Sequence, residues 1–171
     1  MGGTIEVKSE EGIGSTFIIR IPFKLAPAPD TVKKTAAQMD ISGLNLLLVE
    51  DNELNAEIAK TLLSDEGANL TVAEDGLQAV RMFQEKPEGY FDAILMDIMM
   101  PVMDGLTATK TIRSLKHPDA ETIPIIAMSA NAFAEDIINS RISGMDRHLT
   151  KPLEEKKLLA AFRECMGRNM G

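Results

Sequence analysis

Short apolar runs alternate with amphipathic stretches along residues 41–171. Runs typical of strands occur at residues 44–49, 69–73, 91–96, 123–129 and 146–150. A stretch with apolar residues at helical spacing follows each run. In the first of these, Leu54, Ile58 and Leu62 recur every fourth residue, which predicts a helix that ends near Glu66. The others predict helices around residues 79–83, over 105–115, over 133–142, and around Leu158 to Met166. The alternation therefore predicts five consecutive β/α units.

Three of the strand runs, at residues 44–49, 91–96 and 123–129, are almost continuously apolar rather than alternating. Burial on both faces produces this pattern, and such strands belong to parallel sheets covered on both sides by helices. With right-handed crossovers, five β/α units close into a doubly wound sandwich. We therefore predict a (βα)5 α/β fold with a five-stranded parallel sheet in the flavodoxin-like order.

The first forty residues follow a different pattern. Segments Thr4–Ser9 and Ser15–Phe23 are rich in β-formers and flank the turn-forming letters EEGIGS, so residues 1–23 are predicted to form a β-hairpin. Two strands alone are marginally stable in water, and this hairpin needs a neighbour. Residues 24–40 have prolines and no apolar periodicity, which predicts an extended linker before a domain at residues 41–171.

Charge and composition exclude several functions. The net charge of −8 comes entirely from residues 41–171, which hold 13 basic and 21 acidic residues, and only 4% of the chain is aromatic. These features argue against nucleic-acid binding. No apolar run or leader-like start predicts membrane contact, so we expect a cytoplasmic fragment. A single cysteine, Cys165, excludes an internal disulfide, and no Cys/His pair has zinc-ligand spacing.

Polar side chains follow four of the five predicted strands. They are Glu50 and Asp51, then Asp97, Ser129 and Lys151. In a doubly wound sheet the carboxyl ends of the strands form the ligand site. Each close pair of carboxylates there would repel by about 4 kcal/mol at an effective dielectric of 20, so a cation is expected. Oxygen ligands favour Mg²⁺, and the set predicts a phosphate-handling site with one carboxylate as nucleophile.

Four motifs resemble the receiver domain of two-component response regulators. They are LLLVEDN at 46–52, DAILMDIMMPVMDG at 92–105, IPIIAMSANA at 123–132 and GMDRHLTKP at 144–152. The motifs are well separated and occur in the order of that family, which makes the resemblance far more specific than one motif alone. It implies a module that accepts a phosphoryl group from phosphohistidine and then changes conformation.

The resemblance also assigns roles to individual residues. It implies that Asp97 is the phosphoacceptor and that Ser129 and Lys151 contact the phosphoryl group. It implies a Mg²⁺ site with the following ligands: Glu50, Asp51, Asp97 and the main-chain carbonyl of Met99. Ser129 and His148 would be the switch residues, with His148 in the place of the usual switch aromatic.

The resemblance also bears on the lifetime of the phosphoryl group. Met99 and Asn131 flank the phosphorylation site in this family, and neither offers a carboxylate to orient an attacking water. We therefore expect slow self-dephosphorylation, with an acyl phosphate that lasts minutes or more.

The first segment carries a weaker resemblance. Residues 1–23 are similar to the last strands of a histidine kinase ATP-binding domain, including the letters GSTF before an apolar strand. Kinase tail, linker and receiver is the order of hybrid histidine kinases, which implies a kinase phosphodonor domain as partner. We expect no output domain after Gly171, and the expected recipient is therefore a histidine phosphotransfer domain. The glycine loops and metal-binding asparagine motif of such kinases are missing, so this chain should not bind ATP.

Three alternatives stay open at this stage. The first is a Mg²⁺-dependent phosphatase that forms an aspartyl phosphate, although it would need a second acid two residues after Asp97, where the chain has Met99. The second is an interaction module that works without phosphorylation. In the third, residues 1–23 are a native extension that makes a homodimer.

Overall fold

The computed structural model describes residues 2–10, 12, 14–22, 40–130 and 133–166. The chain divides into two compact units, Met1–Thr35 and Ala36–Gly171, and each is considered by itself. Of the predicted linker at residues 24–40, only Asp40 lies within the described residues.

The first unit is an antiparallel hairpin of β1 (Thr4–Glu10) and β2 (Gly14–Arg20), which confirms the predicted hairpin. The register pairs Ile5 with Ile19 and Val7 with Phe17, so these four apolar side chains share one face. All four are more than half exposed within the described residues. The hairpin therefore presents an apolar face without a covering layer of its own.

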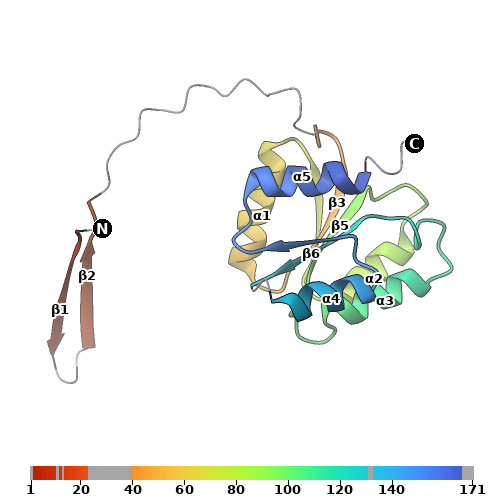
Figure 1. The fold of residues 1–171 in the computed structure, drawn as a ribbon. Helices are drawn as coiled ribbons and strands as arrows, with labels where there is room; N and C mark the ends of the chain where they lie inside the picture. Colours follow the sequence, from red (N-terminus) through yellow and green to blue (C-terminus); the bar gives the residue numbers. More distant parts are fainter. Residues whose placement is uncertain (1, 11, 13, 23–39, 131–132, 167–171) are drawn as a thin grey trace. The chain divides into compact units, whose positions relative to one another are not determined.

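The second unit is a five-stranded parallel sheet with five helices, as predicted (Figure 1). Its strand order is β4-β3-β5-β6-β7. The elements in chain order are β3 (Asn45–Val49), α1 (Glu53–Asp65), β4 (Asn69–Ala73), α2 (Gly76–Glu85), β5 (Ala93–Asp97), α3 (Gly105–Ser114), β6 (Ile125–Ser129), α4 (Ala134–Ile142), β7 (Arg147–Thr150) and α5 (Glu155–Met166). No helix among the described residues combines the length and apolar content that a bilayer crossing requires.

The sheet separates two cores. Successive residues of a strand point to opposite faces, so Leu46 and Leu48 pack with α1 and α5, whereas Leu47 and Val49 pack with α2 and α3. Figure 1 shows α1 and α5 on one side of the sheet and α2, α3 and α4 on the other. Every residue of β5 and β6 is buried, which is the physical reason for their continuous apolar runs.

Helix α1 turns a different face to the sheet from the one its clearest apolar repeat indicates. Leu54 and Ile58, which recur at helical spacing, are 71% and 47% exposed. The buried residues of α1 are instead Ala56, Ala59 and Leu63. Small side chains let the helix lie close to the strands, and an apolar stripe is left on its outer side.

A partly buried guanidinium ties the helix layer to the sheet. Arg113, near the end of α3, donates hydrogen bonds to the carbonyls of Gly144, Ala120 and Ile123 at 2.8–3.0 Å, and to the Asp146 carboxylate at 3.1 Å. Burial lowers the pKa of Arg113, and the charge and hydrogen bond of Asp146 oppose that shift. The contacts tie together the two connections that lead into β6 and β7.

The strand order brings the ends of β3 and β5 together. These two strands are adjacent, and the chain leaves β3 toward β4 on one side and β5 toward β6 on the other. Where the strand order reverses in this way, the connecting loops diverge and leave a crevice beyond the carboxyl ends of the strands. The groups that follow β3 and β5 therefore share one rim.

Candidate functional site

Three carboxylates meet at this rim. Glu50 and Asp51 follow β3, and Asp97 is the last residue of β5. One oxygen from each lies within 4.8 Å of the others. Glu50 is 3% and Asp97 5% exposed, while Asp51 faces solvent. A backbone hydrogen bond from Glu50 N to the Ala73 carbonyl, 3.0 Å, holds the start of the β3–α1 loop.

Lys151 reaches the same carboxylates from the end of β7. Its Nζ donates to Glu50 Oε2 at 2.5 Å and to Asp97 Oδ2 at 2.6 Å. A hydrogen bond from Lys151 N to the Ser129 carbonyl, 2.8 Å, sets its position, and the bond from Lys151 to Pro152 is cis. Burial lowers the pKa of Lys151, but hydrogen bonds and charges of Asp97 and Glu50 outweigh burial and leave that pKa above its usual value.

The charge balance of this group suits a divalent cation. Ionised Glu50, Asp51 and Asp97 carry three negative charges, and Lys151 supplies one positive charge, so two negative charges stay uncompensated within the cluster. Carboxylate oxygens at this spacing are the ligands that hard cations prefer. The three acids can thus hold a metal ion between them, and the residues present fit Mg²⁺.

Met99 lies next to the carboxylate cluster. Its N–H donates to Asp97 Oδ1 at 3.2 Å, and its side chain is 78% exposed. The backbone of Met99 therefore orients the phosphoacceptor candidate. That its carbonyl also binds metal stays a prediction.

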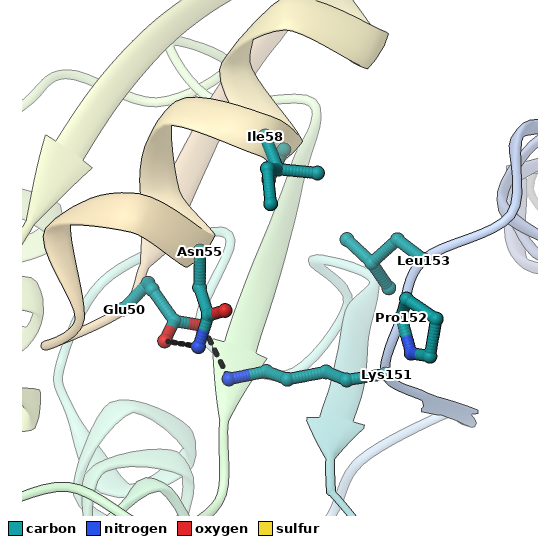
Figure 2. A pocket seen from close by; sticks show the side chains of 7 residues that line it. Glu50, Asn55, Ile58, Lys151, Pro152 and Leu153 are labelled. Carbon is teal, nitrogen blue, oxygen red and sulfur yellow. Dashed lines mark hydrogen bonds and ion pairs between the residues drawn. The ribbon is translucent and has the colours of Figure 1, made fainter. Parts of the chain in front are cut away.

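Asn55 is a site residue that the sequence patterns missed. Its Nδ2 donates to Glu50 Oε1 at 2.9 Å, so both oxygens of Glu50 have a partner, as Figure 2 shows. Asn52 caps α1 by accepting from Asn55 N at 3.0 Å, which places Asn55 in the first turn beside Glu50. The sequence did contain a signal for this contact, namely an amide side chain about one helical turn after the acidic pair Glu50 and Asp51.

Ser129 and His148 lie in the neighbouring strands β6 and β7 and contact each other. Ser129 is buried at the end of β6, and its Oγ lies 2.8 Å from Nε2 of His148 in β7. The two predicted switch residues are therefore in direct contact. Asn131, predicted to flank the phosphorylation site, lies outside the described residues.

The loop from β5 to α3 is tightly built around Asp97. A Cβ added to Gly105 would lie 2.0 Å from the Asp97 carbonyl oxygen, so only glycine allows α3 to start there. Asp104 caps α3 by accepting from Thr107 N at 2.8 Å. Val102 adopts a positive φ of 65°, which β-branched residues strongly disfavour. The loop thus stores strain beside the carboxylates.

The second unit is an α/β domain in which a lysine contacts a buried aspartate, beside acids whose spacing fits a divalent cation. Such an arrangement is suited to bringing a metal ion and a phosphate together. The chain is a member of the response regulator receiver domain family, whose model matches residues 46–163. The family match covers all five strands of the second unit except the first residue of β3.

The chain is similar to parts of much longer signalling proteins. The chain is 39% identical over 127 residues to hybrid signal transduction histidine kinase I of Dictyostelium discoideum, covering 70% of this chain and 7% of the relative. It is 36% identical over 168 residues to the aerobic respiration control sensor protein ArcB of Escherichia coli, covering 96% of this chain and 20% of ArcB. The chain thus spans a small part of the relatives it matches.

Solved structures agree with the fold. The receiver domain of sensor histidine kinase PA1611 from Pseudomonas aeruginosa superposes with a TM-score of 0.66 at 37% identity, covering 74% of this chain and 99% of that one. That structure has a magnesium ion coordinated in its active-site cleft. A receiver domain from Francisella superposes with a TM-score of 0.64 at 29% identity, covering 74% of this chain and 99% of that one.

Proposed function

We propose that residues 41–171 accept a phosphoryl group from a phosphohistidine onto Asp97, with Mg²⁺ held by Glu50, Asp51 and Asp97. The observation that carries the proposal is the contact of Lys151 with Asp97 at 2.6 Å, inside an acidic rim that lacks two positive charges. A nucleophilic carboxylate and phosphoryl oxygens are both negative, so their approach requires this neutralisation.

The reaction uses few groups of the chain. An Asp97 oxygen attacks phosphorus in line as the P–N bond to the donor imidazole breaks, and the imidazole keeps the bonding electron pair. Lys151 Nζ, already beside Asp97, neutralises a phosphoryl oxygen, and Ser129 Oγ donates a hydrogen bond to another. The bound metal supplies Lewis-acid neutralisation of phosphoryl charge. The Met99 N–H holds the second Asp97 oxygen.

A neighbouring surface suits the helix of a phosphodonor or phosphotransfer domain. A cavity of about 40 Å³ next to the Glu50–Lys151 pair is lined by Ile58 and Leu153, among other residues (Figure 2). The exposed Leu54 extends this apolar surface along α1. A partner helix docked there would bring its histidine to the rim by hydrophobic contact, the usual basis of helix-in-groove binding.

The test is phosphorylation by acetyl phosphate and Mg²⁺, followed by intact mass. The wild-type chain should gain one phosphoryl group that base removes, and Asp97→Ala should gain none. Asp92→Ala is the matched control, because Asp92 precedes the same strand but binds Asn45 N rather than the rim. Absence of any acyl phosphate would favour the passive interaction module, and rapid turnover of a general phosphate ester would favour the phosphatase.

For residues 1–23, we propose that the hairpin is the last part of a histidine kinase ATP-binding domain. The match to ArcB covers 96% of the chain and so extends well beyond the receiver domain. The uncovered apolar face of β1 and β2 supports a missing sheet neighbour. Sedimentation of the full chain and of a chain without residues 1–23 separates the alternatives: a dimer lost on deletion would instead favour the homodimerising extension.

A further inference from the structure

His148 connects the candidate site to helix α4 through two hydrogen bonds. Its Nε2 lies 2.8 Å from Ser129 Oγ, and its Nδ1 lies 3.3 Å from Oγ of Ser140 in α4. Ser140 is 1% exposed and Ser129 4% exposed. One imidazole therefore joins the hydroxyl at the end of β6, the strand that pairs with the strand of Asp97, to a buried hydroxyl of a helix.

The direction of these hydrogen bonds follows from the partners of Ser140. Ser140 Oγ donates to the Ile137 carbonyl at 2.9 Å, which uses its only proton, so it accepts from His148. His148 Nδ1 must then carry the ring proton. A neutral imidazole has one donor and one acceptor, so Nε2 accepts, and Ser129 Oγ is the donor. Ser129 Oγ thus donates a hydrogen bond to His148 Nε2 in the unphosphorylated chain.

Few buried side chains hold helix α4 in place, so these hydrogen bonds matter for its position. Ser140 is the only buried residue among residues 134–142, and the N-cap Phe133 makes no side-chain cap hydrogen bond. Ile138 and Ile142 are largely exposed. A helix with one buried side chain has little packing to hold its position, so the His148–Ser140 contact has a large share in setting it.

We propose that Ser140 is a positioning residue that ties α4 to the phosphorylation state of Asp97 through His148, which is fixed as the Nδ1–H tautomer. The proposal rests on the proposed function, since it takes Asp97 as the phosphoacceptor. When Ser129 turns its hydroxyl proton to a phosphoryl oxygen, no proton is transferred, but Nε2 loses its donor. The ring must turn to regain one, and its contact with Ser140 breaks.

The first measurement needs no substitution. Nitrogen-15 spectra of the imidazole at pH 8, above the ordinary histidine pKa of about 6.5, report which ring nitrogen bears the proton. We expect His148 of the unphosphorylated chain to be protonated at Nδ1. After acetyl phosphate treatment, with one phosphoryl group confirmed by mass, both ring nitrogen signals should move. An Nε2–H tautomer at the start, or unchanged signals in the phosphorylated chain, would overturn the inference.

The second measurement uses matched serines. Ser140→Ala removes the acceptor, and Ser143→Ala removes a buried hydroxyl that also donates to a carbonyl, that of Asn139 at 2.9 Å, but has no hydrogen bond to His148. Both variants should gain the phosphoryl group. Amide signals of residues 134–142 should shift on phosphorylation in the wild type and in Ser143→Ala, and this response should be lost in Ser140→Ala. Equal responses in the two variants would refute the role of Ser140.

These outcomes separate the two proposals. A chain that gains no phosphoryl group contradicts the proposed function, and the tautomer of the unphosphorylated chain still tests the hydrogen-bond direction. A chain that is phosphorylated without a change at His148 contradicts the inference alone. Thermal unfolding of Ser140→Ala and Ser143→Ala shows that a lost response does not come from a lost fold.

Discussion

Replacing Lys151 with methionine tests the charge arrangement of the site most directly. The side chain keeps its apolar length but loses the ammonium that contacts Glu50 at 2.5 Å and Asp97 at 2.6 Å. Both carboxylates are nearly fully buried and would be left next to each other without a cation. Removing one partner of a buried ion pair costs about 3–5 kcal/mol, and we expect Lys151→Met to lower the free energy of unfolding by about that amount.

Urea unfolding of the second unit without metal is the assay, and Lys157→Met is the matched control. Lys157 pairs with Glu154 at 2.6 Å, the same separation, but both side chains are more than half exposed. Such surface pairs contribute at most about 1 kcal/mol, so the control should lose little. If Lys151→Met were no more destabilising than Lys157→Met, the buried-charge argument would be wrong.

Added Mg²⁺ and changes of pH provide two further tests of the stability difference between the wild type and Lys151→Met. Mg²⁺ should stabilise the Lys151→Met variant, by about 2.7 kcal/mol at a concentration 100 times its dissociation constant, because it replaces the lost positive charge. The pKa of Lys151 is raised in the folded chain. Its contribution is therefore fully present below the unfolded value of about 10.4 and is lost as pH rises through the folded pKa. The difference between wild type and variant should persist through neutral pH and shrink only in strong alkali.

Three further substitutions probe the frame around the site. Gly105→Ala places a Cβ 2.0 Å from the Asp97 carbonyl, so α3 or Asp97 must move, and we expect a loss of about 1–3 kcal/mol in stability together with slower acetyl phosphate labelling; normal labelling would contradict this. Val102→Asn relieves the positive φ and should stabilise the fold by about 1 kcal/mol in urea; a lower midpoint would refute strain there. Arg113→Met leaves the carbonyls of Gly144, Ala120 and Ile123 without their side-chain donor, and thermal unfolding should show a loss of about 1–3 kcal/mol; an unchanged midpoint would show that these carbonyls regain partners.

Helix α1 shows where reasoning from periodicity reaches its limit. Leu54 and Ile58 indicated a helix correctly, but they lie on its exposed side, and the buried side is made of Ala56, Ala59 and Leu63. A repeat in the sequence reports that one face is apolar. It does not report whether that face meets the sheet or a partner, because both remove apolar area from water.

The sequence by itself determined the order of strands and helices, the parallel sheet, the hairpin and the polar groups at the strand ends. Local periodicity encodes burial, and the carboxyl ends of parallel strands lie at a common edge, so the sequence alone predicts that Asp97, Asp51 and Lys151 lie close together. Only the tertiary structure decided the contacts of Asn55 with Glu50 and of His148 with Ser140. Those contacts depend on side-chain direction and helix placement to within an ångström, which packing of the whole unit sets and no local pattern encodes.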